Sequence, residues 1–307
     1  MLLFLFLVIF SVVAMSSPYN YVIISGCNAC STLASLDFGN RNLSLSMTSA
    51  TPMPNPSWIV SSSDYLTKLL TNTYIYSVFE TKLFSAEGSG AVGAYKLNRD
   101  GSLNLINVVG TVDSTPVHMS LYNVPKSDRY RLFIANNVGS VTVLQANVAT
   151  DGSIDDAPLQ YIKYPVPDGA TSNPFLHQII VYKDYAYAVD RNTDRIYIYP
   201  INLSSGLLEE QLMTTLLLSS GSGPRHLAFH PTQPLAFLVS EFASSMTLLS
   251  VAADRPSEIT VVAVYSMLRP NETTDDMAGG GKFFIARVSL TYAVYHSGVA
   301  DAYYNSL

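Results

Sequence analysis

The stretch Gly223-Pro224-Arg225-His226-Leu227-Ala228-Phe229-His230-Pro231 is followed by an apolar run that ends at Ser240-Glu241. In this stretch a Pro-x-His turn leads into a short β-type run, and a polar residue falls four places after an aromatic one. The same skeleton recurs along the chain at an interval of about fifty residues. Repeats of this length, built from short alternating strands, are typical of a β-propeller, in which each repeat is one four-stranded blade.

The repeats can be counted from one aromatic or aliphatic position in each Tyr-Ile-Tyr-type run. The members of this column are Ile23, Tyr76, Phe133, Tyr187 and Phe237, with Phe284 as a weaker sixth. They lie 53, 57, 54, 50 and 47 residues apart. Turn pairs such as Asp100-Gly101 and Asp151-Gly152 separate alternating runs, as they do in β-hairpins. The sequence therefore predicts an all-β propeller of about six visible blades, in a single domain over 17–307 whose last blade is degenerate.

Composition agrees with this fold class and limits the function. Twenty Tyr, thirteen Phe and only 13% charged residues suit twisted sheets that are buried on both faces. A net charge of −6, without any Lys/Arg cluster, argues against a nucleic-acid partner. No dense carboxylate cluster of the kind that binds divalent cations is visible, so we expect neither a metal nor a cofactor.

The N-terminus has the character of a signal peptide over residues 1–16. Leu2 to Val13 is an apolar run apart from Ser11, and Ala14-Met15-Ser16 follows as a small-x-small cleavage pattern. We expect a secreted protein that has no membrane contact after cleavage; an uncleaved membrane anchor is the alternative. Three N-x-[ST] sequons, at Asn42, Asn202 and Asn271, predict glycosylation on exposed turns.

The two cysteines, Cys27 and Cys30, stand as Cys-Asn-Ala-Cys directly after the first strand-like run. A redox site would need a helix start within a βαβ unit, and a zinc site would need two further ligands nearby. The sequence offers neither, so we expect a local disulfide between these two residues in an oxidising compartment.

Titratable residues recur at two positions of the repeat. The turn-to-strand column holds Trp58, His118, His177 and His226. The column four places after the aromatic holds Glu80, Asn137, Arg191 and Glu241. Because the innermost strand of every blade lines a central channel, residues of one column converge at one channel mouth. We therefore expect a small-molecule site there, with His177, Arg225 and Glu241 as catalytic residues and His118, His226 and Glu80 as substrate-binding residues.

Each of these residues also has a structural interpretation. His118 and His226 occupy near-identical turns and can simply satisfy backbone groups, while His230 before Pro231 is expected in an outer turn. Arg225 has no charged counterpart in the equivalent turns, and a single cation facing a channel favours a ligand clamp. Glu241 interrupts an apolar run and would lie near Arg225, so a structural ion pair is its alternative role.

The Gly-Pro-Arg-His-Leu-Ala-Phe-His-Pro block, followed by Val-Ser-Glu, resembles the lactonase family of seven-bladed β-propellers. That family includes bacterial-type 6-phosphogluconolactonases and fungal carboxy-cis,cis-muconate cyclases. Asn55-Pro56-Ser57-Trp58 and Tyr76-Ser77-Val78-Phe79-Glu80 match its earlier repeats, and the resemblance covers roughly residues 19–265.

The resemblance implies an active site of a His, the Arg of Gly-Pro-Arg-His and a Glu, which map to His177, Arg225 and Glu241. A fourth family residue, the Arg of a Ser-Asn-Arg motif, has no match, and Arg287 is a poor candidate because it lies in an apolar run. Six repeats instead of seven indicate a C-terminally truncated chain, with a six-bladed variant as the alternative.

The resemblance favours a monomeric lactone hydrolase acting on a sugar-derived or similar lactone. In such a reaction Glu241 or His177 would act on water as the base, and Arg225 would hold the substrate's anionic group or stabilise the oxyanion. A lactonizing cyclase of the muconate type and a non-catalytic secreted binding module are the alternatives.

Overall fold

The computed structural model describes residues 11–14, 21–25, 32–37, 44–62 and 73–268. Within these ranges the secondary structure is β-strand, apart from the short 3-10 helix η3 at Glu210–Leu212. The all-β prediction is therefore confirmed. No helix of the described residues is long and apolar enough to cross a membrane.

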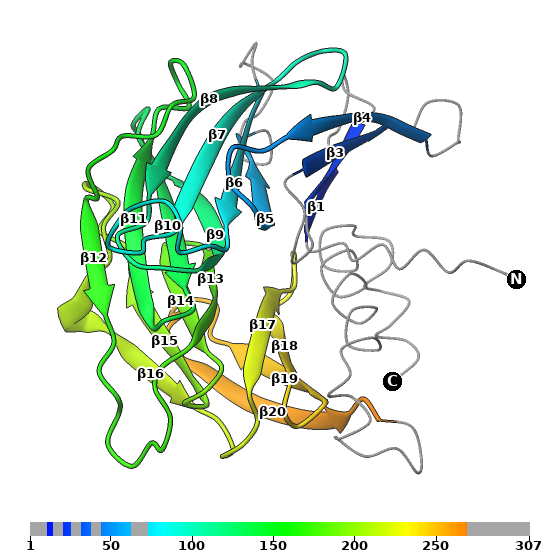
Figure 1. Ribbon diagram of the computed structural model, residues 1–307. Helices are drawn as coiled ribbons and strands as arrows, with labels where there is room; N and C mark the ends of the chain where they lie inside the picture. The colour runs from blue at the N-terminus through cyan, green and yellow to red at the C-terminus, as the bar shows by residue number, and fades with distance from the viewer. Residues whose placement is uncertain (1–10, 15–20, 26–31, 38–43, 63–72, 269–307) are drawn as a thin grey trace, which may run out of the picture. The chain divides into compact units, whose positions relative to one another are not determined.

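Twenty strands form five four-stranded sheets, and in each sheet four strands consecutive in the chain lie side by side (Figure 1). The strands are β1 (Ser11–Ala14), β2 (Tyr21–Ser25), β3 (Thr32–Asp37), β4 (Ser44–Ala50), β5 (Pro56–Ser61), β6 (Thr73–Phe79), β7 (Ala91–Leu97), β8 (Leu103–Gly110), β9 (Pro116–Asn123), β10 (Tyr130–Asn136), β11 (Ser140–Ala146), β12 (Gln160–Lys163), β13 (Leu176–Tyr182), β14 (Tyr185–Asp190), β15 (Arg195–Pro200), β16 (Thr214–Leu217), β17 (Pro224–Phe229), β18 (Leu235–Ser240), β19 (Ser245–Val251) and β20 (Ile259–Ser266). This consecutive order is that of a propeller blade.

The repeat column predicted from the sequence falls at one position of each sheet. Its five described members all lie on the second strand of their sheet; they are Ile23 on β2, Tyr76 on β6, Phe133 on β10, Tyr187 on β14 and Phe237 on β18. The sixth member, Phe284, lies outside the described residues. β1 lies within the segment predicted to be a signal peptide and pairs antiparallel with β2; cleavage of that segment stays a prediction.

The chain divides into two compact units. The first comprises the residues up to Asn136 together with Val141–Tyr161, and the second comprises Asn137–Ser140 and the residues from Ile162 onward. The sheets β13–β16 and β17–β20 belong to the second unit, which also contains Arg225 and Glu241.

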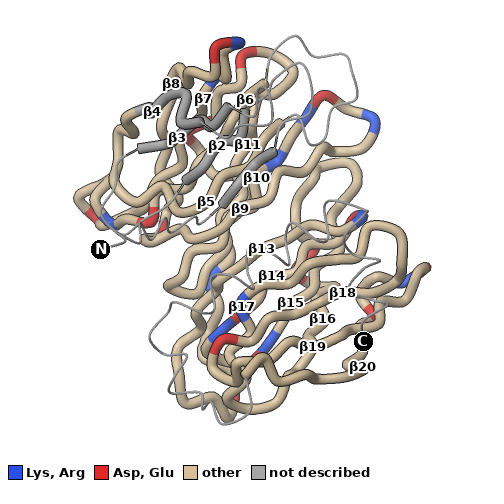
Figure 2. The backbone as a smooth tube through the Cα atoms, turned by 90° about the vertical axis from the view of Figure 1, so that its right-hand side faces the viewer, with Lys and Arg blue, Asp and Glu red and all other residues tan. Residues whose placement is uncertain are grey.

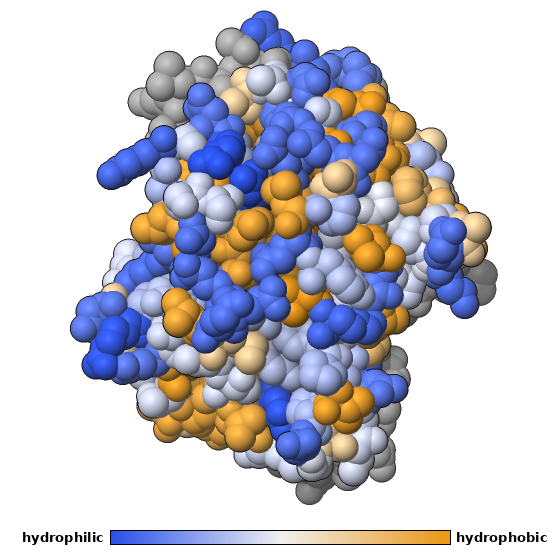
Figure 3. Space-filling model, turned by 90° about the vertical axis from the view of Figure 1, so that its left-hand side faces the viewer, coloured by the Kyte–Doolittle hydropathy of each residue, from blue (hydrophilic) through white to orange (hydrophobic). Residues whose placement is uncertain are grey.

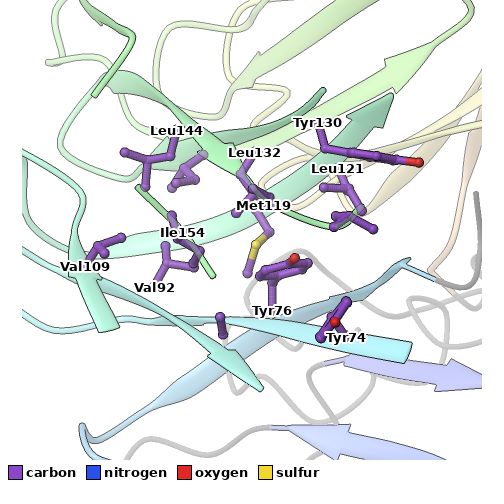
Figure 4. Close-up of a cluster of buried hydrophobic side chains, with 14 of the residues drawn as sticks. Tyr74, Tyr76, Val92, Val109, Met119, Leu121, Tyr130, Leu132, Leu144 and Ile154 are labelled. Carbon is purple, nitrogen blue, oxygen red and sulfur yellow. The ribbon is translucent and has the colours of Figure 1, made fainter. Parts of the chain in front are cut away.

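Each unit has its own apolar core. In the first unit, Tyr76, Met119 and Leu132 are at most 1% exposed, and Figure 4 shows their side chains among those of neighbouring strands. In the second unit, Tyr187, Leu227 and Phe229 belong to one buried cluster. Alternate residues of a strand point to opposite faces, so strands buried on both faces are apolar almost throughout.

Charged residues lie mostly in turns rather than in strands, as Figure 2 shows. On the face shown in Figure 3, hydrophobic and hydrophilic side chains are interspersed. One cluster of charged side chains, formed by Arg191, Arg225 and Glu241, lies in the second unit.

Candidate active site

The first strand of four sheets begins with the same irregularity, a β-bulge. Register shifts fall between Pro56 and Trp58, between Pro116 and His118, between Leu176 and Gln178, and between Pro224 and His226. In each case the Cα pairing with the second strand skips one residue of the first strand. These bulged residues are Ser57, Val117, His177 and Arg225.

The bulges correct the predicted column of Trp58, His118, His177 and His226. The register pairs Gln178 with Val189, just as it pairs His226 with Val239. Gln178 therefore occupies the position equivalent to His226, and His177 is equivalent to Arg225. A bulge re-aims one side chain and is frequent beside active sites, so His177 and Arg225 share a position that suits a functional group.

Three of the four members of the second predicted column, Glu80, Arg191 and Glu241, share a repeated backbone hydrogen bond. The residue that follows the second strand donates its N–H to the carbonyl two places before the bulged residue. These bonds run from Glu80 to Asn55 at 2.9 Å, from Arg191 to Phe175 at 3.0 Å and from Glu241 to Gly223 at 2.7 Å. Residues of this column are thereby fixed next to the bulge of their own sheet.

Arg225 and Glu241 meet as the sequence predicts, and Arg191 joins them. Arg225 Nη1 donates to Glu241 Oε2, and Arg191 Nη1 donates to the same oxygen at 3.1 Å. The side chains are 17%, 20% and 32% exposed for Arg225, Arg191 and Glu241. Two guanidinium groups on one carboxylate leave a formal charge of about +1, so the cluster can attract an anion or a developing oxyanion.

Arg191 is held between aromatic rings. Its Cζ lies 4.0 Å from the ring centroid of Phe175 and 5.3 Å from that of Phe242. Rings at this distance attract a guanidinium group through their negative faces. These contacts limit the freedom of Arg191, and the carboxylate that it binds is held correspondingly more firmly.

The histidines of the second unit form a pair. The rings of His177 and His226 have centroids 4.9 Å apart at an interplanar angle of 73°, and each residue is 7% exposed. His226 directly follows Arg225 on β17, whereas His177 lies on β13. The ring contact therefore joins His177 to the residue next to Arg225, and a common site for His177, Arg225 and Glu241 stays a prediction.

Arg225 retains donor capacity beyond its ion pair. Its Nε is buried and makes no hydrogen bond among the described residues. An unsatisfied donor on a buried guanidinium group is costly unless a ligand or water accepts from it. This donor therefore favours a ligand-binding role for Arg225 over a purely structural ion pair.

Glu80 and His118, predicted to bind substrate, belong to the first unit. The ring of His118 lies 3.9 Å from that of Trp58, centroid to centroid, and His118 is 3% exposed. The backbone carbonyl of Glu80 accepts from Asn55 Nδ2 at 3.2 Å. Their roles in binding stay predictions.

Among the other predicted sites, only Asn202 lies in the described part of the chain. Its Nδ2 donates to Glu209 at 3.0 Å, and its Oδ1 accepts from the backbone N–H groups of Ser204 and Ser205. It is therefore a turn-forming residue as well as a sequon. Cys27, Cys30, Asn42, Asn271 and Arg287 lie outside the described residues. No group of three or more His, Cys, Asp or Glu side chains in the described ranges could hold a metal ion.

Sequence reasoning missed two residues that support this site. Gln178 Oε1 accepts from the N–H of Leu227 at 2.6 Å and so joins β13 to β17. Asp194 accepts from the loop that leads into β17. The only signal for Gln178 was the extra residue between Pro174 and His177, and Asp194 gave none.

Within the described residues, five sheets of consecutive strands, four of them with a bulged first strand, define a β-propeller chain, and its second unit carries a cationic cluster and a pair of imidazoles. The chain belongs to the family described as Lactonase, 7-bladed beta-propeller, whose model matches residues 27–287. The predicted family resemblance is thereby confirmed.

Relatives of this chain include proteins named 6-phosphogluconolactonase. That of Bacillus subtilis (strain 168) is 27% identical over 237 residues, which make up 75% of this chain and 60% of that protein. That of Formosa agariphila is 22% identical over 233 residues, or 73% of this chain and 64% of that protein. The chain thus spans less than two thirds of the length of these relatives.

Solved structures agree on the fold. The periplasmic gluconolactonase of Pseudomonas aeruginosa matches with a TM-score of 0.66 at 18% identity, over 82% of this chain and 69% of that one. A protein from Lactobacillus plantarum matches with a TM-score of 0.61 at 21% identity, over 79% and 64%. At these identities the likeness concerns the fold.

Proposed function

We propose that this chain is a lactone hydrolase, with its site at the Arg225–Glu241–Arg191 cluster and the His177–His226 pair. The observation that carries the proposal is the pair of guanidinium groups on one carboxylate oxygen, with Arg225 next in the chain to His226 of the buried imidazole pair. Membership of the lactonase family and relatives named 6-phosphogluconolactonase support it. The substrate class is a sugar-derived or similar lactone.

His177 is the better of the two candidate bases. Glu241 Oε2 already accepts from two guanidinium groups, so this oxygen is engaged by the arginines. An imidazole titrates near neutral pH and serves readily as a general base. In this proposal Glu241 orients the arginines, and His177 takes the proton of the attacking water.

The reaction then runs as an acyl transfer to water. The water oxygen forms a bond to the lactone carbonyl carbon while His177 accepts its proton. Arg225, whose side chain is 17% exposed, stabilises the charge on the carbonyl oxygen through its guanidinium group. Collapse of the tetrahedral intermediate breaks the ring C–O bond, and the proton passes from His177 to the leaving alkoxide.

The net charge of the cluster favours hydrolysis over cyclisation of a muconate-type acid. A polycarboxylate substrate needs several cations to balance it, whereas Arg225 and Arg191 share the carboxylate of Glu241. The remaining positive charge suits one anionic group or one oxyanion. The cyclase and the non-catalytic binding module are therefore outcomes that the assay can reveal.

A pH-stat assay on glucono-δ-lactone tests the proposal. The wild-type chain should release acid faster than the uncatalysed lactone, and Arg225→Ala should lose a factor of about 10²–10³, typical for one oxyanion-stabilising donor. Arg255→Ala is the matched control, because Arg255 is 65% exposed and its ion pairs in the described part of the chain are with the surface carboxylates of Asp254 and Glu258. Equal rates for the three proteins would refute a catalytic role.

The secretory route, glycosylation and the monomeric state are part of the same proposal. The apolar run at residues 2–13 and the three sequons support it. N-terminal sequencing of the protein from a eukaryotic secretory host should begin after residue 16, and a glycosidase should increase its gel mobility. Recovery of the intact N-terminus from the membrane fraction would favour the anchor, and light scattering would report a dimer if one exists.

A further inference from the structure

The turn between β14 and β15, residues 191–194, contacts the neighbouring sheet β17–β20 at two separate points. Arg191, at its beginning, binds the carboxylate of Glu241, which follows β18. Asp194, at its end, binds the loop that leads into β17. Both contacts lie within the second unit.

Asp194 fixes the segment directly before Arg225. Its carboxylate accepts from the N–H of Gly221 at 2.7 Å, from Ser222 Oγ at 2.9 Å and from the N–H of Gly223 at 2.8 Å. Three hydrogen bonds to one charged acceptor are strong and directional. Only Pro224 separates this segment from Arg225, so the orientation of the segment determines the backbone position from which the Arg225 side chain extends.

Arg191 fixes the partner of Arg225. It donates to the same oxygen of Glu241 that accepts from Arg225. Phe175 contacts Arg191 from its own sheet and Phe242 from the neighbouring one. Two aromatic rings, one from each sheet, therefore contact the guanidinium group while it holds the carboxylate.

The turn is itself anchored. Asp190 is fully buried and accepts from the N–H groups of Phe175, Asn192 and Thr193, and from Thr193 Oγ1. Burial raises the pKa of the Asp190 carboxyl above its usual value. A turn bound this tightly to its own sheet can transmit a fixed geometry to the next sheet.

We propose that the 191–194 turn is the positioning element of the site, and that Arg191 and Asp194 act through Glu241 and Arg225. Neither residue needs to touch the substrate in this role. The proposal rests on the proposed lactonase activity for its kinetic test, but its second test does not use activity at all.

The kinetic test is a pair of double-mutant cycles on glucono-δ-lactone. Asp194→Ala should lower kcat/KM by about ten- to hundredfold, within the range of coupling between residues of one network. In the Arg225→Ala background, Asp194→Ala should not lower kcat/KM any further, because Asp194 acts only through that arginine. Arg191→Met should behave in the same way towards Glu241→Ala, and Arg191→Lys should recover part of the loss. Additive effects in both cycles would overturn the proposal.

The structural test is amide hydrogen exchange of Gly221 and Gly223. In Asp194→Ala both amides should exchange at least about tenfold faster, as expected when a hydrogen bond is lost. Asp194→Asn, which keeps one acceptor oxygen, should lie between, and Asp168→Asn at an exposed aspartate is the control. Unchanged exchange in Asp194→Ala overturns the proposal even if the wild type proves inactive, whereas faster exchange in an inactive protein would count against the lactonase function alone.

Discussion

Two glycines in the loop before β17 provide a matched test of the packing around the site. Gly221 and Gly223 both have positive φ, +75° and +62°, and both donate their N–H to Asp194. A Cβ added at Gly221 would meet nothing within 4 Å. A Cβ added at Gly223 would lie 2.5 Å from the ring of Phe242 and 2.9 Å from its backbone nitrogen.

The magnitudes follow from these distances. An alanine in the left-handed region costs about 1–2 kcal/mol, and this term applies equally to both positions. Overpacking adds about 1–3 kcal/mol at Gly223 alone, because the backbone nitrogen of Phe242 cannot rotate away as a side chain can. We therefore expect Gly223→Ala to lower the free energy of unfolding by about 2–5 kcal/mol and Gly221→Ala by about 1–2 kcal/mol.

Urea denaturation of the wild type and the two variants measures this difference, with equal m-values as the sign that only stability has changed. Thermal midpoints should fall by about 2–4 °C for each kcal/mol in a domain of 150–250 residues. Gly223→Ala should also reduce activity, because Phe242 contacts Arg191. Equal destabilisation by the two variants would refute the collision, and with it the packing of Phe242 against Gly223.

Burial raises the pKa of Asp190, so the folded chain binds this proton more tightly than the unfolded chain does, and the resulting stability is lost as the pH rises through the folded pKa. The wild type should therefore lose thermal stability relative to Asp190→Asn as the pH rises above the ordinary range of an aspartate carboxyl, and a difference that stays constant with pH would contradict this. Met119→Ala should lower the free energy of unfolding, measured by urea denaturation, by about 2–5 kcal/mol because it leaves a cavity in a core. Its control is Leu83→Ala, at a residue 68% exposed, which should change that free energy by less than about 0.5 kcal/mol. Gln178→Met should lower the free energy of unfolding by about 1–3 kcal/mol, because the backbone N–H of Leu227 loses its acceptor, and hydrogen exchange of this amide should become faster. Unchanged protection of the Leu227 amide would contradict the hydrogen bond to Gln178.

The repeat column was predictable because burial fixes it. Tyr76, Phe133 and Tyr187 each lie on the second strand of a sheet and are fully buried. A strand buried on both faces must be apolar, so its sequence marks its position even where the repeats differ in length. The polar residue that follows, such as Glu241, was predictable for the same reason, since it ends an apolar run.

The register at the start of each blade was not predictable. The repeats differ by up to ten residues in spacing, and a bulge inserts a single residue without a sequence signature of its own. A shift of one residue turns a side chain to the other face, which is why His177 was aligned with His226 instead of Arg225. The contacts of Arg191 and Asp194 were missed because they join two sheets through a turn, and turns carry no periodicity.

The bulge also explains how one backbone position can carry such different side chains. The Cα register with the neighbouring strand skips Ser57, Val117, His177 and Arg225, so a directly opposite cross-strand residue does not restrict which side chain stands there. The residue after the bulge is restricted in this way, because Gln178 and His226 each pair with a buried valine. Chemistry can therefore change at the bulged position while the pairing of the sheet stays the same. In the second unit this position holds an imidazole and a guanidinium group on adjacent sheets, which is the combination that the proposed hydrolysis requires.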